Sequence, residues 1–163
     1  MKRSILAVCA VLAVGCSQSP VSPTDSSVGG AAATAARIDT SLGSGGRPLE
    51  ATLTGAAERP GPGDPDGTGT ARITLNPGQG EICFELTVAN IATATAAHIH
   101  EAPASAAGPV VVGLTAPASG TSKGCRSVDP ELVREIMKDP SNYYVNVHNA
   151  PFPGGAVRGQ LSK

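Results

Sequence analysis

The amino-acid sequence predicts an all-β domain, an antiparallel sandwich or Greek-key barrel with one short helix, and three observations support this fold class. Short runs of alternating apolar residues recur along the chain and are separated by clusters of turn-forming residues. The composition includes 20 Gly and 14 Pro but no Trp, two Phe and two Tyr, so Val, Ile, Leu and Ala must form the core. Only one segment has the spacing of an amphipathic helix.

Eight segments have the length and the alternation that are typical of strands. The clearest is 81–88, in which every second side chain from Ile82 to Val88 is apolar and the others are mostly polar. Dense Gly, Pro and Asp residues at 61–67 predict a long turn between the first two strands. The expected strands are 49–54, 70–75, 81–88, 95–101, 109–114, 122–128, 143–148 and 155–161.

The one expected helix spans 130–138. Asp129 is a favourable N-cap, Pro130 suits the first helical position, and Glu131 complements the positive end of the helix dipole. Apolar residues then fall on one stripe, which indicates that the helix packs on the barrel. The dipeptide Asp139-Pro140 ends the helix, because a residue before proline is disfavoured in helical conformation.

The N-terminus has the features of a bacterial lipoprotein signal. Lys2 and Arg3 precede an apolar run at 4–14, which is too short to span a bilayer as a mature helix. The following Gly15-Cys16 junction resembles a lipobox, in which the cysteine thiol receives diacylglycerol. We therefore expect residues 1–15 to be a signal peptide and Cys16 to carry palmitate-type chains that anchor the protein. The alternative is ordinary signal cleavage nearby, which leaves Cys16 unmodified.

Two further segments are expected after the signal peptide. Residues 16–47 begin with the lipidated Cys16 and continue as a linker rich in Ser, Gly, Ala and Pro, which cannot bury enough surface to order itself. The folded domain is expected at 48–163. The net charge of −1, with basic residues scattered singly, excludes a nucleic-acid footprint.

Cys83 and Cys125 are the only cysteines of the expected domain. In an exported protein, a pair of cysteines usually forms a disulfide. We therefore expect a Cys83–Cys125 bridge, with two free buried thiols as the alternative.

All three histidines lie in two expected strands, as His98-Ile99-His100 and at the end of 143–148. Strand alternation turns Ile99 to the core, so that His98, His100 and His148 point away from it. Three neutral imidazoles are suitable ligands for zinc or copper. The alternative is a structural role, in which these rings and the neighbouring polar side chains hydrogen-bond loop backbone and tie the loops to the barrel. The side chains expected in this polar network are Asn146, Arg158 and Gln160.

Other candidate sites are weaker. Glu58, Asp64 and Asp66 surround a Gly/Pro turn but lack the spacing of a calcium-binding loop, which favours a solvated acidic turn. No phosphate-binding loop, Ser-His-Asp order or paired carboxylate stands out. The sequence therefore predicts no catalytic residue and no enzyme activity.

Four ordered motifs resemble the CHRD domain, a module named after chordin, an antagonist of growth factors. They are His98-Ile99-His100, 108–114, 144–148 and 153–161, and 53–60 is similar to the start of the family. The resemblance covers about 48–163 and implies an immunoglobulin-like barrel with distant similarity to copper/zinc superoxide dismutases. Many members have an acidic residue where this chain has Ala156, a departure that removes a carboxylate near Arg158.

The resemblance implies an exported binding or structural module, because bacterial members have no settled activity and chordin acts outside cells. Superoxide dismutases share a His-x-His-Glu run but need further histidines and an aspartate that this chain lacks, so redox turnover is not expected. The leading interpretation is a non-enzymatic, lipid-anchored envelope protein, facing the periplasm or cell surface, with an unidentified protein partner. The second is an envelope protein that binds zinc or copper at His98, His100 and His148.

Overall fold

The computed structural model describes residues 46–163, and the statements below concern that part of the chain. The expected signal peptide, the lipidation site at Cys16 and nearly all of the expected linker lie outside the described residues. Within the described part, no helix has both the length and the apolar character needed to cross a membrane.

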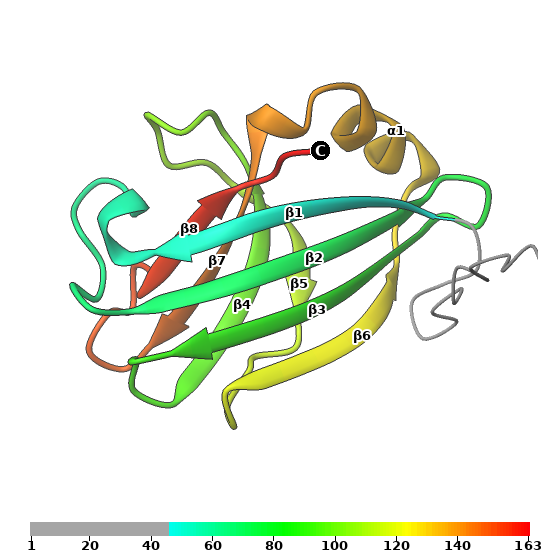
Figure 1. Cartoon of the computed structure of the whole chain (residues 1–163). Coiled ribbons are helices and arrows are strands. Elements are labelled where there is room, and N and C mark those ends of the chain that lie inside the picture. The colour runs from blue at the N-terminus through cyan, green and yellow to red at the C-terminus, as the bar shows by residue number, and fades with distance from the viewer. Residues whose placement is uncertain (1–45) are drawn as a thin grey trace, which may run out of the picture. The chain divides into compact units, whose positions relative to one another are not determined.

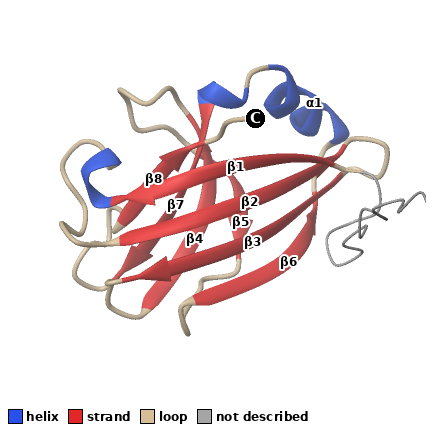
Figure 2. Ribbon diagram, in the orientation of Figure 1, coloured by secondary structure: helices blue, strands red, loops and turns tan. Residues whose placement is uncertain are grey.

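Eight strands and one α-helix form the domain (Figure 1), and the strands are its main regular structure (Figure 2). The strands are β1 (Arg47–Thr54), β2 (Thr68–Asn76), β3 (Glu81–Ala89), β4 (Ala94–Glu101), β5 (Val110–Leu114), β6 (Thr121–Ser127), β7 (Tyr143–Asn149) and β8 (Val157–Gln160). Helix α1 (Pro130–Lys138) lies between β6 and β7, and short 3₁₀ turns occupy Gly55–Ala57 and Pro140–Asn142. The predicted all-β class with one short helix is confirmed.

All neighbouring strands are antiparallel, in the order β5-β4-β7-β8-β1-β2-β3-β6. The connections β3–β4 and β6–β7 cross between the two halves of this sheet, as in a Greek key. The sheet curls into a nearly closed barrel, in which side chains bridge the remaining seam between β5 and β6. The Arg126 guanidinium on β6 donates to the Gly113 carbonyl on β5 at 3.1 Å and to the Thr115 hydroxyl at 2.8 Å.

The core follows from the alternation along the strands. On β3, Ile82, Phe84 and Leu86 are fully buried. Glu85 and Thr87, which flank Leu86 and point to the other face, are exposed. The same alternation on the other strands places Leu, Ile and Val inside the barrel. The core side chains on these strands include Leu49, Leu53, Ile73, Leu75, Ile99, Val145, Val147 and Val157, and Leu161 follows directly after β8.

Helix α1 packs on the barrel as its apolar stripe predicts. Its N-cap Asp129 accepts a hydrogen bond from the Glu131 amide at 2.8 Å. Val133 and Ile136 are fully buried and join the core. Both ends of the helix match the sequence prediction, because capping residues and a proline mark them in the chain itself.

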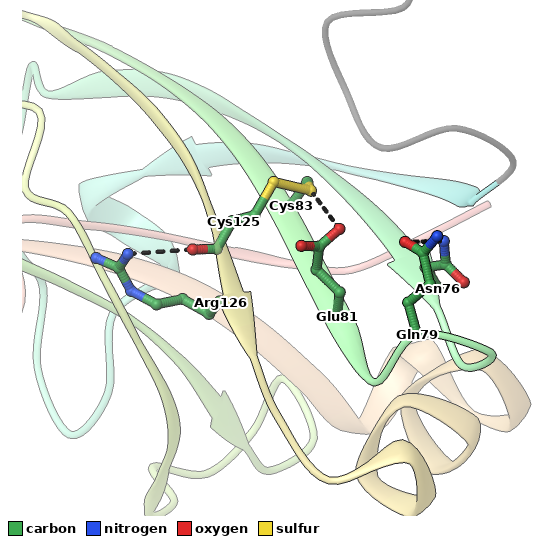
Figure 3. The surroundings of a disulfide bond; sticks show 6 residues. All are labelled: Asn76, Gln79, Glu81, Cys83, Cys125 and Arg126. Carbon is green, nitrogen blue, oxygen red and sulfur yellow. Dashed lines mark hydrogen bonds between the residues drawn. A yellow bond between two sulfur atoms is a disulfide. The ribbon is translucent and has the colours of Figure 1, made fainter. Parts of the chain in front are cut away.

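The predicted disulfide joins Cys83 to Cys125 across β3 and β6 (Figure 3). The two residues stand directly opposite each other in the register of these strands. A carboxylate oxygen of Glu81 lies 3.4 Å from the Cys83 sulfur, and Arg126 lies next along β6. The bridge therefore ties the edge strand β6 to the centre of its half of the sheet, far along the strand order from the histidines.

Candidate functional site

The three histidines meet on the face of β4, β7 and β8 that points away from the core, called the outer face below. On β4, Ile99 is fully buried in the core, while His98 and His100 lie on the other side. On β7, Asn146 stands opposite His98, and His148 follows two residues later on the same face. The ring centroids are 5.0 Å apart for His98 and His148, and 5.5 Å for His98 and His100.

Hydrogen bonds to loop carbonyls determine which ring nitrogens carry hydrogen. His100 Nδ1 lies 2.9 Å from the Gly108 carbonyl oxygen, and His148 Nδ1 lies 3.0 Å from that of Pro153. A carbonyl oxygen only accepts, so both Nδ1 atoms donate and both Nε2 atoms carry a lone pair in the neutral rings. The Nε2 atom of His100 is buried and has no hydrogen-bond partner within residues 46–163.

One potential ligand nitrogen from each of His98, His100 and His148 lies within 4.8 Å of the others. Burial lowers the pKa of His98, and the neighbouring His148 and His100 lower it further. Burial also lowers the pKa of His148, against the opposing effect of its bond to the Pro153 carbonyl. Neutral imidazoles with fixed tautomers are the form in which histidine binds a metal ion.

The same face holds a buried stack of Arg158, Tyr144 and His100. The Arg158 guanidinium carbon lies 3.4 Å from the centroid of the Tyr144 ring. The opposite neighbour of that ring is the His100 imidazole, at 4.8 Å and nearly parallel, with 7° between the planes. Arg158 is 1% exposed although it points away from the core, because loop 102–109 covers it.

Polar side chains of the outer face hold that loop in place. Arg158 donates to the Ala106 and Pro103 carbonyls at 2.9 and 3.0 Å. Gln160 donates to the Ala102 carbonyl at 2.7 Å and to the Ser141 carbonyl at the same distance. Arg158 and Gln160 thus contact loop backbone, and His100 and His148 do so through their Nδ1 atoms. Asn146 and His98 contact His148 instead.

Glu58 is a buried carboxyl group that the sequence interpretation missed. It is 3% exposed, and its Oε1 atom has no partner in the described part of the chain. Burial raises its pKa to about 7, although Arg158, Arg59 and a hydrogen bond with Asn146 favour the charged form. The predicted solvated acidic turn is therefore wrong for Glu58, and also for Asp64, which is 9% exposed.

The burial of Glu58 and Asp64 comes from tertiary contacts between two loops. Loop 55–67 folds against loop 150–156, where the Asp64 amide donates to the Ala156 carbonyl at 2.8 Å. The one local signal was the absence of an acidic residue at position 156, since Arg158 then needs a carboxylate from elsewhere. Glu58, about one hundred residues away in sequence, lies close enough to Arg158 for the guanidinium to lower the pKa of its carboxyl group.

A second group of potential ligand atoms, Glu81, Cys83 and Cys125, has a different status. Both thiols form the disulfide, so neither is a thiolate that could bind a metal ion. Glu101, which follows His100 in sequence, accepts a hydrogen bond from Asn142 at 3.4 Å and is not part of the histidine cluster. The outer face is therefore the place where the predicted site residues converge.

Comparison with known proteins identifies the family. The sequence profile of the CHRD domain matches residues 49–161, which is more than half of the chain and includes every strand except the first residues of β1. Comparisons with curated proteins and with solved structures find no match. The match includes the His98–His100 and His148 segments and the strand that carries Arg158. The chain belongs to the CHRD domain family.

Proposed function

We propose that this protein is a lipid-anchored envelope protein whose CHRD domain is a non-enzymatic binding module, and that its outer face binds zinc or copper. Membership of the CHRD family supports the binding or structural role in general. The charged start, the short apolar run and the Gly15-Cys16 junction support export and anchoring. The arrangement of the three histidines supports the binding of a metal ion.

One observation carries the metal proposal. The Nε2 lone pair of His100 is buried without a partner in residues 46–163, and one nitrogen of this ring lies within 4.8 Å of a nitrogen of His98 and of His148. A buried polar atom without a hydrogen bond has a free-energy cost of about 1 to 3 kcal/mol, which a bound cation would remove. The Gly108 and Pro153 carbonyls also act as the outer partners that orient metal-binding imidazoles.

The chemistry of the donor set is consistent with this assignment. Imidazole nitrogens suit zinc and copper, whereas calcium and magnesium prefer oxygen ligands. The lowered pKa values of His98 and His148 keep both rings neutral near physiological pH, so protons compete weakly for them. Zinc or copper would accept electron pairs from the three rings.

Elemental analysis of the full mature protein, purified from its native envelope, tests the metal proposal. We expect near-stoichiometric zinc or copper, and its loss in the variants His98→Ala and His148→Ala. Glu131→Gln on the exposed face of α1 is the control and should retain the metal. Metal-free protein whose melting temperature is unchanged by added zinc or copper would contradict the proposal and leave a purely structural role for the histidines.

Fractionation of cells tests the anchor independently. Cys16→Ala should move the protein from the membrane fraction to the soluble fraction, because the thiol is the acylation site. Cys9→Ala, within the apolar part of the expected signal peptide, is the matched control and should leave the distribution unchanged. Membrane association that persists in the Cys16→Ala variant would contradict lipid anchoring at this residue.

A further inference from the structure

Asn146 lies at the centre of the outer face, between the histidine cluster and Glu58. In the register of the strands it stands between His98 on β4 and Arg158 on β8. Its side chain is 2% exposed, and its Oδ1 atom lies 3.0 Å from His148 Nε2. A side-chain hydrogen bond with Asn146 is also among the causes that lower the pKa of Glu58, so the two groups are neighbours. Asn146 therefore connects a ring of the cluster to the buried acid.

The contact between Asn146 and His148 brings two acceptors together. His148 uses its Nδ1 hydrogen on the Pro153 carbonyl, so its Nε2 carries a lone pair. The Oδ1 atom of Asn146 is also an acceptor only. Two lone pairs facing each other at 3.0 Å repel unless a positive charge lies near both. His98 Nδ1, at 3.1 Å from His148 Nε2, can donate one hydrogen to that nitrogen. This bond still leaves Asn146 Oδ1 without a hydrogen-bond donor in residues 46–163.

The Asn146 amide has Oδ1 toward His148, which leaves its NH₂ group facing away from the histidines, on the side of Glu58. An ionised carboxylate only accepts, so Glu58 in its ionised form favours this orientation over the reverse. The opposite orientation would set Oδ1 against a negative charge. Gly155 also lies against Glu58, since a Cβ at that position would overlap the carboxyl group.

The missing positive charge must lie where it faces both His148 Nε2 and Asn146 Oδ1, next to the lone pairs of the other two imidazoles. A metal ion held by the histidine lone pairs would satisfy His148 Nε2 and Asn146 Oδ1 together. Amide oxygens are established ligands of cations in proteins, and a fourth protein ligand closes a tetrahedral site.

We propose that Asn146 Oδ1 is the fourth ligand of the metal ion, and that Glu58 is a positioning residue that orients the amide by accepting its NH₂ hydrogen. This inference rests on the proposed metal-binding function. It makes the site a closed one, with three imidazoles and one amide oxygen, which is typical of metal sites that bind rather than catalyse. All four ligands are neutral, and the nearby Glu58 carboxylate balances part of the charge of the ion.

The test is a titration of the full mature protein with Cu²⁺ alone, followed by calorimetry and by electron paramagnetic resonance, at mildly alkaline pH where Glu58 is ionised. Asn146→Ala should weaken binding by about 10- to 100-fold and change the copper spectrum, because a ligand oxygen is lost. Asn146→Asp keeps the shape and adds a charge, so it should bind at least as tightly, with a changed spectrum. Glu58→Gln should weaken binding by about 10-fold without touching the metal.

Gln160→Ala is the matched control. Gln160 is a partly buried amide of the same face, but it bonds the Ala102 and Ser141 carbonyls and does not contact the histidines. Its removal should lower stability and leave the copper spectrum unchanged.

The outcomes separate the two proposals. If the protein without substitutions binds no copper or zinc, the proposed function fails and this inference fails with it. If it binds copper, and both Asn146→Ala and Asn146→Asp leave affinity and spectrum unchanged, Asn146 is not a ligand although the three-histidine site stands. Should Asn146→Ala fail to fold, the isosteric Asn146→Asp still decides the question, because an unchanged spectrum in that variant overturns the assignment.

Discussion

Gly155 lies against the carboxyl group of Glu58, so closely that a Cβ on Gly155 would overlap its oxygen atoms. Gly155 also has a φ of +142°, which side chains rarely adopt. The pair joins the β7–β8 loop to the β1–β2 loop and buries the acid beside Arg158 and Asn146. Glycine is thus needed at this position for two reasons: the backbone has a positive φ, and the Glu58 carboxyl group leaves no room for a side chain.

Gly155→Ala should lower the free energy of unfolding by about 2 to 4 kcal/mol, from backbone strain and from displacement of Glu58. Gly154→Ala is the matched control, because Gly154 is exposed and a Cβ there meets no atom within 4 Å. That control should change stability by less than about 0.5 kcal/mol. Urea unfolding of both variants measures the difference, and equal effects would contradict the close packing of Gly155 on Glu58.

Glu58→Gln should stabilise the protein increasingly as the pH rises. The pKa of Glu58 is about 7 in the folded protein against an ordinary value of 4.5, so the unfolded chain releases this proton first. Between these pH values, folding therefore requires the carboxyl group to keep its proton. The contribution of Glu58 to stability falls by about 3 kcal/mol across that window and is constant above it.

Glutamine does not titrate, so the difference in stability between Glu58→Gln and the unmodified protein isolates this effect from the histidines. The measurement is urea unfolding with a chelator present, at pH values below, within and above the window. The difference should grow with pH and then level off. A difference that is independent of pH would show that Glu58 ionises normally.

Reduction of the Cys83–Cys125 disulfide should destabilise the domain by up to about 4 kcal/mol. The bridge closes a loop with a sequence separation of 42, and chain entropy in the unfolded state is the main reason for the effect. Urea unfolding with and without a reductant measures the loss. In the double variant Cys83→Ser/Cys125→Ser the reductant should have no effect, and a midpoint that shifts there as well would point to another cause.

Arg158→Ala should lower stability by about 3 to 5 kcal/mol, because it removes a buried side chain from the Tyr144 ring and frees the Pro103 and Ala106 carbonyls. Arg126→Ala is the comparison, since Arg126 also donates to a backbone carbonyl, that of Gly113 on β5, but is exposed. Its effect should stay below about 1 kcal/mol.

Hydrogen exchange gives this comparison a local readout. Amides of loop 102–109 should exchange faster in Arg158→Ala and remain unchanged in Arg126→Ala. Unchanged exchange in both variants would mean that Arg158 does not hold the loop.

The parts of the fold with local signals could be predicted from the sequence. Alternation predicted β3 because only one face of that strand meets the core, and capping residues predicted both ends of α1. The last strand is shorter than predicted, Val157–Gln160 instead of 155–161, because Gly155 takes a positive φ that no strand adopts. The facing of His98, His100 and His148 was also predicted, since side-chain direction alternates along a strand.

The burial of the outer face could not be predicted in this way. Alternation shows that Arg158 and Asn146 point away from the core, but they are 1% and 2% exposed because loops fold over them. No periodicity in loop 102–109 or in loop 55–67 indicates where it will lie. The same limit explains why Glu58 was assigned to a solvated turn.

The sequence by itself determined the all-β class, the strand faces, the single helix, the cysteine pair and the family, because each depends on residues near one another or on ordered motifs. Only the tertiary structure decided that Glu58 meets Asn146 and Arg158, and that the Gly108 and Pro153 carbonyls set the tautomers of His100 and His148. These contacts join segments that are distant in sequence. Their geometry depends on how loops close over a finished barrel, which local propensities do not encode.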